Sequence, residues 1–262
     1  MNFHWDQKLK WVLSLIMHRY QILIEYVGTN FIGWQIQSTG RSVQKLIQFR
    51  LTKLLKEKIS LVGSGRTDSG VHAIEQSAHF DCKKKIINLN KFLKSLNHFI
   101  NNKAVSILII KKRSLKFHAR YSAKQRIYKY IIFNRLSRPS IEKERGWHII
   151  KNLDIKLMKK GAKKLLGTND FSTFRSSSCN ANSPIRTMKS IKIKSSKGRI
   201  EIQFKSQSFL QQQVRSMVGC LKYLAENKWD LKKFEIAFKS KKRTLCAPPA
   251  PAEGLFLEKV IY

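Results

Sequence analysis

Residues 63–73 read GSGRTDSGVHA, and this glycine-rich stretch decides how the rest of the chain is interpreted. Its three glycines allow backbone conformations and close approaches that a Cβ atom would prevent. Asp68 lies among them, two residues after Arg66. A neighbouring cation favours the charged form of a carboxylate, which suits a nucleophile or a base. From the residues alone, a turn in which Asp68 merely accepts hydrogen bonds from nearby backbone N–H groups explains the stretch as well.

Other catalytic templates do not fit the chain. The stretch lacks the GK[ST] ending of a phosphate-binding P-loop, and no GxGxxG follows a predicted strand. There is also no GxSxG, no HExxH and no D-x-D pair for metals. His72, beside the stretch, fits a structural role better than a catalytic one. We therefore expect neither a metal nor a cofactor.

The charge balance points to an anionic partner. The chain has 262 residues, with 52 Lys and Arg against 16 Asp and Glu, a formal net charge of +36. Phosphate neutralisation by Lys and Arg makes nucleic acid the first class to consider. A compositional bias toward Lys, Ile and Asn and an anionic membrane surface are the two alternatives. Three basic segments are candidates for phosphate contacts, namely residues 83–85, 111–113 and 241–243.

The N-terminus and the cysteines indicate the cellular compartment of the protein. Residues 1–18 contain a short apolar run after two lysines but no small-residue cleavage site, so we interpret them as an extension or a misplaced start. No stretch approaches the roughly 18 apolar residues that a spanning helix needs. Four widely separated cysteines form no CxxC pair, so neither a zinc site nor a disulfide framework is indicated. A cytoplasmic protein without membrane contact is expected.

The hydrophobic pattern predicts two similar halves in which strands and helices alternate. The seam is expected near residues 111–115, which gives an N-terminal half over 19–113 and a C-terminal half over 114–262. The predicted strands are 20–26, 76–82, 105–110, 125–133, 185–195, 200–204 and 255–261. One predicted helix begins at residue 42 and ends before residue 63. The other predicted helices cover 89–100, 154–166, 211–226 and 230–240.

The stretch GSGRTDSGVHA resembles the active-site motif of the tRNA pseudouridine synthase A family, in which a Gly-Arg-Thr-Asp loop presents the catalytic aspartate. The resemblance covers roughly residues 19–262 and, because its segments are collinear, is more specific than the loop alone. It implies an α+β fold of two ferredoxin-like or RRM-like halves, fused into one curved, mostly antiparallel sheet backed by helices. Further matching segments are 28–35, 117–123, 126–130, 170–175, 209–219 and 252–257.

The resemblance also implies a reaction and a partner. The reaction is isomerisation of uridine to pseudouridine at nucleotides 38, 39 and 40 of tRNA, catalysed by a homodimer. Asp68 is implied as the catalytic carboxylate, acting on a flipped-out uridine. Whether it attacks C1′, adds to the ring or removes a sugar proton is left open.

Three further residues receive roles through the resemblance. Arg66 is implied to hold the space vacated by the flipped nucleotide or a phosphate beside it. Arg215 is implied to pair with Asp68, although a solvated position on an apolar helix is the alternative. Tyr128, on a strand face shared with Tyr130, is expected to stack on uracil, whereas Tyr130 is expected in the core.

One position of this sequence departs from the pattern of the family. Val27 stands where the family commonly has Asp, so one turn or RNA contact is expected to be missing.

A non-catalytic RNA-binding or RNA-folding module is the rival functional class, because a net positive charge and an aromatic strand suffice for it. Asp68 argues against that class, since a carboxylate in a basic loop repels phosphate.

Overall fold

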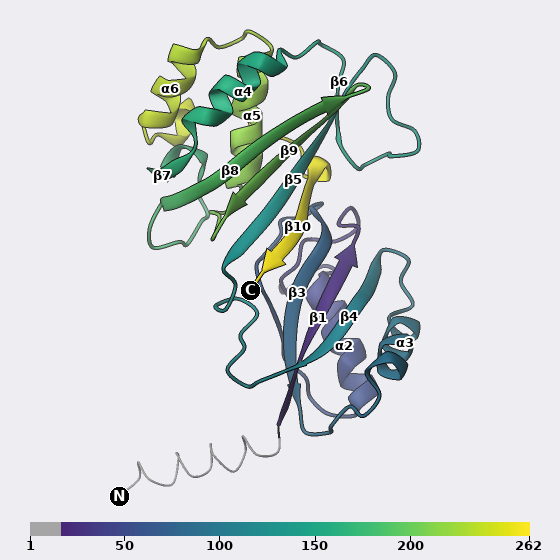
Figure 1. The fold of residues 1–262 in the computed structure, drawn as a ribbon. Coiled ribbons are helices and arrows are strands. Elements are labelled where there is room, and N and C mark those ends of the chain that lie inside the picture. Colours follow the sequence, from purple (N-terminus) through teal and green to yellow (C-terminus); the bar gives the residue numbers. More distant parts are fainter. Residues whose placement is uncertain (1–16) are drawn as a thin grey trace, which may run out of the picture.

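The computed structural model describes residues 17–262, so nearly all of the expected extension over residues 1–18 lies outside the described part. Within the described part, no helix is both long and apolar enough to cross a membrane. Ten strands form one sheet, which five α-helices accompany in residues 17–262 (Figure 1).

The N-terminal half is a βαββαβ unit whose strands lie in the order β4-β1-β3-β2. This is the strand order of a ferredoxin-like unit, the kind of half that the resemblance implied. Figure 1 shows α2 behind the strands of this half and α3 beside β4. Its elements are β1 (His18–Tyr26), α2 (Val43–Leu55), β2 (Leu61–Gly63), β3 (His72–Cys82), α3 (Leu89–Ile100) and β4 (Val105–Arg113).

The C-terminal half repeats this arrangement, with strand order β10-β5-β9-β8. Helix α5 lies behind β8 and β9, with α4 and α6 beside it (Figure 1). Short strand β7 extends the sheet beyond β8, and β6 pairs with β5. The elements are β5 (Gln125–Asn134), β6 (Trp147–Ile149), α4 (Ile155–Lys164), β7 (Gly167–Asp170), β8 (Ile185–Ser196), β9 (Arg199–Ser206), α5 (Gln213–Ala225), α6 (Leu231–Lys239) and β10 (Leu255–Ile261).

Strand β10 joins the halves into a continuous sheet. It runs parallel to the start of β3, with Phe256 opposite His72, and antiparallel to β5, with Leu257 opposite Tyr128. Apart from β10–β3 and β5–β6, the described strand pairs are antiparallel. The predicted α+β fold of two similar halves in one mostly antiparallel sheet is therefore confirmed, while the division at residues 113 and 114 stays a prediction.

Four of the five α-helices in residues 17–262, all except α5, begin where the sequence places a capping side chain. Ser42 and Asn88 accept hydrogen bonds from backbone N–H groups in the first turns of α2 and α3, and Asp154 and Asp230 do the same for α4 and α6. The strands β2, β6 and β7, of three or four residues each, were not predicted, because so few residues show no alternation.

Candidate active site

Asp68 lies in the loop between β2 and β3, and neighbouring segments hold that loop in place. The Tyr26 hydroxyl and Thr67 Oγ1 are 2.8 Å apart, and the Trp34 backbone N–H donates to the Thr67 carbonyl over 3.1 Å. The Ser69 hydroxyl donates to the Phe31 carbonyl over 3.2 Å. The turn after β1, which matches the family's N-terminal segment, thus supports the residues on both sides of Asp68.

Glycines permit this close packing of two loops. Gly33 has φ +114°, and a Cβ atom there would lie 2.6 Å from the Thr67 carbonyl oxygen. Gly70, which follows Asp68 by two residues, has φ +77°. Gly65 has neither property, since a Cβ atom there would meet only the Arg126 guanidinium at 3.6 Å. Gly70 therefore fits the predicted conformational role, and Gly65 does not.

Arg215, on the first turn of α5, is the cation beside Asp68. Its Nη1 lies 3.6 Å from Asp68 Oδ2, and its Nε donates to the Ala250 carbonyl over 2.7 Å. The Arg215 side chain is 16% exposed and the Asp68 side chain 28%, so the pair is partly shielded yet open to solvent. The alternative that Arg215 is a solvated residue is wrong.

The protonation of Asp68 is set by two opposing effects. Burial raises the pKa of its carboxyl above the ordinary value, while the charge of Arg215 and its hydrogen bond lower it. From the sequence, the neighbouring cation was expected to decide the balance. Burial is the larger effect, so this expectation is corrected: the carboxyl holds its proton to a higher pH than a free aspartate does.

Arg66 does not pair with Asp68. Its side chain is exposed and makes no ion pair with any residue in 17–262. The reason is local, because buried Thr67 is anchored between the two residues and Arg66 is directed to solvent. The expectation that Arg66 helps to ionise Asp68 is therefore wrong, whereas a contact with a bound nucleotide stays a prediction.

Tyr128 is nearly buried, and its expected stacking on uracil stays a prediction. The residue is 8% exposed and its ring meets Phe209 edge-on, with 5.1 Å between ring centroids. Burial raises the pKa of Tyr128 to about 12, with the charge of Arg126 opposing the shift and that of Asp68 adding to it. Tyr130 is fully buried, and its hydroxyl donates to the Pro251 carbonyl over 2.8 Å.

Arg126 fastens the catalytic loop and was missed as a site residue. Its Nη2 donates to the carbonyls of Ser64 at 2.6 Å and Arg120 at 2.9 Å, and its Nη1 donates to Gln207 at 2.6 Å. One guanidinium thus ties together three segments that are distant in sequence. Its position two residues before Tyr128 places both side chains on one strand face, which is the signal that was available.

His72 has a structural role, as its position suggested. Its Nδ1 accepts a hydrogen bond from the Gly28 backbone N–H over 3.0 Å, so its Nε2 donates to the Glu253 carbonyl over 3.1 Å. Burial lowers the pKa of His72 to about 4, which keeps the ring neutral at physiological pH. The residue therefore links the turn after β1 to the segment that leads into β10.

Val27 does not disrupt the turn that follows β1. Its backbone N–H donates to the Ala104 carbonyl over 2.8 Å, and Phe31 N–H closes the turn on the Gly28 carbonyl over 2.9 Å. The expected loss of a turn is thus not observed. A lost RNA contact at this position stays a prediction.

Comparisons with known proteins agree with this geometry. The tRNA pseudouridine synthase family matches residues 22–122 and 162–262, which include Asp68 and Arg215. The chain belongs to the tRNA pseudouridine synthase family. It is an isomerase of this family, and the predicted resemblance is confirmed.

Relatives of the synthase match it over almost the whole chain. It is 82% identical over 246 residues to tRNA pseudouridine synthase A of Pelagibacter ubique (strain HTCC1062). This alignment covers 94% of this chain and 100% of that protein. The proteins of the same name from Sinorhizobium fredii (strain NBRC 101917 / NGR234) and Sinorhizobium medicae (strain WSM419) are 41% and 40% identical over 248 residues. Each comparison again covers 94% of this chain and 100% of the relative.

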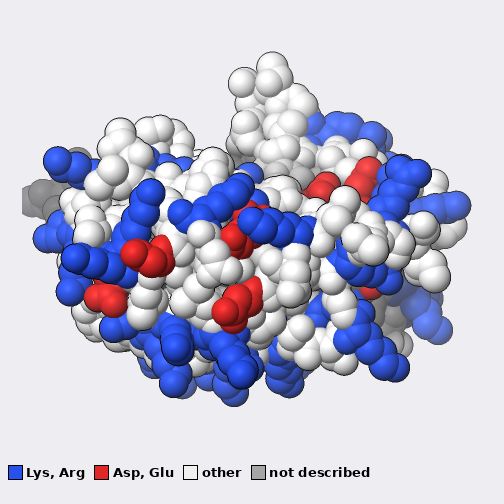
Figure 2. Space-filling view, turned by 90° about the horizontal axis from the view of Figure 1, so that it is seen from above, with Lys and Arg blue, Asp and Glu red and all other residues white. Residues whose placement is uncertain are grey.

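The surface of the synthase is strongly basic. Lys and Arg side chains spread over the face seen in Figure 2 and gather along one rim, whereas Asp and Glu occur in small separate groups. Some of these basic side chains make contacts within the protein. Lys241 lies 3.6 Å from Asp170, and Arg243 donates to the Ser216 hydroxyl over 2.8 Å. The segment 241–243 is thus less available for phosphate than expected.

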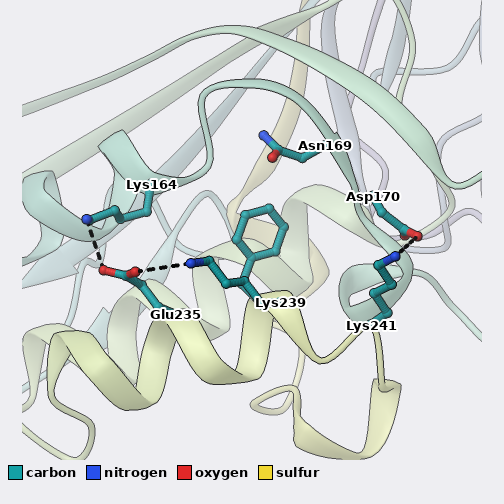
Figure 3. Close-up of a pocket in the computed structure, with 7 residues that line it drawn as sticks. Lys164, Asn169, Asp170, Glu235, Lys239 and Lys241 are labelled. Carbon is teal, nitrogen blue, oxygen red and sulfur yellow. Dashed lines mark ion pairs between the residues drawn. The ribbon is translucent and has the colours of Figure 1, made fainter.

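A surface hollow of about 340 Å³ in the C-terminal half of the synthase does not form part of this site (Figure 3). Its charged groups pair with one another: Lys164 lies 3.0 Å from Glu235, and Lys239 lies 3.9 Å from the same carboxylate. The remaining charged groups of the hollow, Lys241 and Asp170, are also paired with each other. Across residues 17–262, no group of three or more His, Cys, Asp or Glu is arranged to hold a metal ion.

Proposed function

We propose that this chain isomerises uridine to pseudouridine at nucleotides 38, 39 and 40 of tRNA, with Asp68 as the catalytic carboxylate. The single observation that carries the proposal is the Asp68–Arg215 pair, which is partly exposed and whose two residues lie within the segments that match the tRNA pseudouridine synthase family. In the reaction, the C1′–N1 bond breaks and a C1′–C5 bond forms. N1 gains a proton and C5 loses one, so atoms balance without a cofactor.

The reaction needs one charged carboxylate, and the surroundings of Asp68 suit it to this role. Arg215 stabilises its charged form, and the hydrogen bond from Arg215 to the Ala250 carbonyl keeps the guanidinium in place. Burial strengthens the electrostatic interaction, because fewer waters screen it. Attack on C1′, addition to the ring and abstraction of a sugar proton all start from this ionised carboxylate.

The target uridine must leave its stack before it reaches Asp68. Flipping costs a few kcal/mol, which is least in loops and at the ends of helices. Nucleotides 38, 39 and 40 lie where the anticodon stem meets its loop, at the end of a helix, so this cost is low there. Tyr128, on whose pKa the charge of Asp68 acts, is assigned to the flipped uracil through the 8% of the residue that is exposed. Exposed Arg66 contributes a cation for the vacated space or an adjacent phosphate.

Assembly and location are part of the proposal. We propose a cytoplasmic homodimer that binds tRNA and no membrane. The support is the resemblance over residues 19–262 together with the net charge of +36, which suits a polyanionic substrate. Sedimentation of the protein with and without tRNA measures the dimer directly.

The experiment uses purified protein and unmodified tRNA transcripts that carry uridine at nucleotides 38, 39 or 40. Pseudouridine is mapped by carbodiimide labelling followed by mild alkali, which leaves the label only on the isomerised base. We expect label at these nucleotides and none at uridines of the other arms. Binding without label at any position would support the rival reading of a non-catalytic RNA-binding module.

A further inference from the structure

Tyr121 is an exposed aromatic residue that neither the fold nor the proposed chemistry uses. It lies in the connection between β4 and β5, residues 114–124, and is 77% exposed. This connection forms no helix and contains no strand in the structure. Exposure alone does not distinguish Tyr121 from other surface hydrophobic residues, so the contacts that position its ring are the relevant observation.

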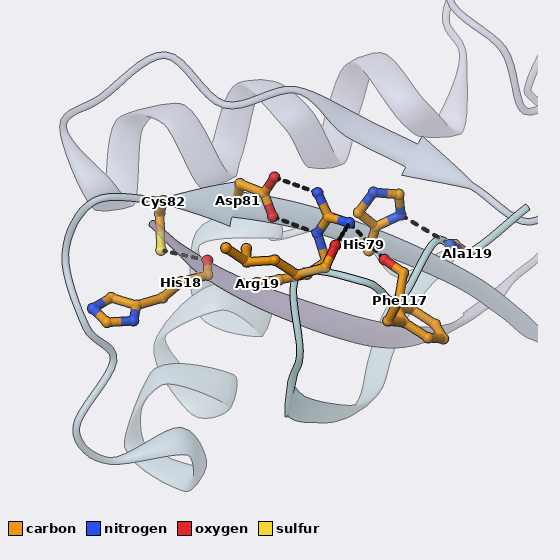
Figure 4. Close-up of polar contacts among 8 residues, drawn as sticks. His18, Arg19, His79, Asp81, Cys82, Phe117 and Ala119 are labelled. Carbon is orange, nitrogen blue, oxygen red and sulfur yellow. Dashed lines mark hydrogen bonds and ion pairs between the residues drawn. The ribbon is translucent and has the colours of Figure 1, made fainter. Parts of the chain in front are cut away.

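The connection is fixed to the sheet despite its irregular backbone. Arg19 binds Asp81 through two hydrogen bonds of 2.7 Å and donates from Nη1 to the carbonyls of Leu115 and Phe117 at 2.7 and 2.6 Å (Figure 4). Further on, the Ala119 backbone N–H donates to buried His79 Nδ1 over 3.1 Å. These contacts hold the backbone on both sides of residue 118.

The same connection is tied to the catalytic loop. The Tyr262 hydroxyl donates to the Ala119 carbonyl over 2.8 Å, and Arg126 donates to the Arg120 carbonyl over 2.9 Å. Arg126 also binds the carbonyl of Ser64, the residue that begins the loop carrying Asp68. Residues 119 and 120 therefore have a defined position relative to the catalytic loop.

The ring of Tyr121 is itself held in one orientation. It stacks on His118, with ring centroids 4.4 Å apart and an interplanar angle of 30°. The backbone N–H groups of Arg120 and Tyr121 both donate to His118 Nδ1, at 3.1 and 3.2 Å. The Arg120 guanidinium lies 5.5 Å from the centroid of the Tyr121 ring. An aromatic face with an adjacent cation is thus presented to solvent before any ligand binds.

We propose that Tyr121 and Arg120 form a stacking platform for an unpaired base of the RNA substrate, beside the target uridine. This inference rests on the proposed function. Aromatic and guanidinium planes bind splayed-out bases of single-stranded RNA, and the stack accepts any base. Residues 114–124 contain three exposed cations and no acidic residue, which suits a phosphate backbone. The preorganised ring lowers the entropy cost of binding.

The chain offers a matched control. Phe49, on α2, is 49% exposed, and the Lys53 ammonium lies 4.6 Å from its ring centroid. It combines an exposed aromatic ring with a cation, as Tyr121 does, but none of the contacts above tie it to the catalytic loop. A general effect of removing an exposed aromatic residue would therefore appear in Phe49→Ala as well.

The test measures binding of a synthetic anticodon stem–loop RNA to the full chain. We expect Tyr121→Ala to weaken binding about 5- to 100-fold, the range for loss of one stacked base, whereas Tyr121→Phe and Phe49→Ala bind as the parent does. In parallel, 5-iodouridine is placed at single positions of the loop and crosslinked by light. We expect the crosslinked peptide to contain Tyr121.

Unchanged binding by Tyr121→Ala, equal weakening by Phe49→Ala, or crosslinks confined to other peptides would each overturn the platform. Failure of the proposed function gives a different result. In that case the parent chain binds the stem–loop with the same dependence on Tyr121 but forms no pseudouridine in it. Pseudouridine formation by a Tyr121→Ala variant that binds normally would instead leave the function standing without the platform.

Discussion

Arg215 Nη1 lies 3.6 Å from Asp68 Oδ2, and the pair links the loop between β2 and β3 to the first turn of α5. The two residues come from different halves of the chain. They meet because β10 lies between β3 and β5 and joins the halves into one sheet. The segment before β10 takes part directly, since the Ala250 carbonyl accepts the hydrogen bond from Arg215 Nε. The fold thus places the carboxylate and its cation together.

Replacing Arg215 is expected to change the pH dependence of the reaction. Burial raises the pKa of Asp68 and Arg215 lowers it, so Arg215→Met removes the opposing effect and raises the pKa further. The acid limb of the kcat/KM profile then moves to higher pH, and kcat/KM at neutral pH falls by about 100-fold. Arg66→Met is the control, because Arg66 makes no ion pair with Asp68. An equal displacement of the limb in both variants would argue against this account of Arg215.

Arg126 is expected to act as a positioning residue. Arg126→Ala removes the donors that hold Ser64, Arg120 and Gln207, and a small displacement of the catalytic loop costs about 100-fold in kcat. Arg126→Lys keeps a cation but not the fork of donors, so it recovers only part of the rate. Steady-state kinetics separates the effects: a loss confined to KM would show that Arg126 binds RNA instead.

Tyr128→Ala is expected to reduce turnover through the site, whereas Tyr130→Ala acts through folding. The charge of Asp68 acts on the pKa of Tyr128, while Tyr130 is fully buried and bound to the Pro251 carbonyl. Truncation of a buried aromatic ring costs about 3–5 kcal/mol of stability. The measurement is the rate per folded molecule, with unfolding followed by circular dichroism. Equal rates per folded molecule in the two variants would remove Tyr128 from the site.

Acid is expected to destabilise the protein through His72. The pKa of His72 is about 4 in the folded chain against an ordinary 6.5, so the unfolded chain binds more protons between these values. The resulting stability is fully present above pH 6.5 and is lost as the pH falls toward 4. It amounts to at most about 3 kcal/mol. His72→Asn, which keeps an acceptor for Gly28 N–H, should flatten this dependence in urea unfolding. The exposed His98→Asn is the control and should leave it unchanged.

Local signals in the sequence predicted most of the fold. Helix α3 was predicted with its observed bounds, 89–100, and the structure adds that the Asn88 side chain caps its first turn. Strand β2 was missed, and it is the strand that completes the N-terminal ferredoxin-like unit. Its three residues gain their conformation from pairing with β3, a long-range contact that no local pattern records.

The candidate site was less predictable than the fold. Asp68 stood out because an acid within a glycine-rich basic loop is unusual, but its cation was assigned partly to the wrong residue. Proximity in sequence suggested Arg66, whereas the structure brings Arg215 from the distant helix α5. The contacts of Arg126 were also invisible, since they join carbonyl groups from three loops. Such contacts depend on the assembled sheet.

The most direct test concerns Asp68 itself. Tritium release from C5-labelled uridine in tRNA is measured for the parent chain and for Asp68→Ala and Asp68→Asn, together with tRNA binding. We predict that both variants bind tRNA about as well as the parent and lose at least about 1000-fold in tritium release, because the only carboxylate paired with Arg215 among residues 17–262 is gone. Tritium release at the parent rate by either variant would contradict the central claim.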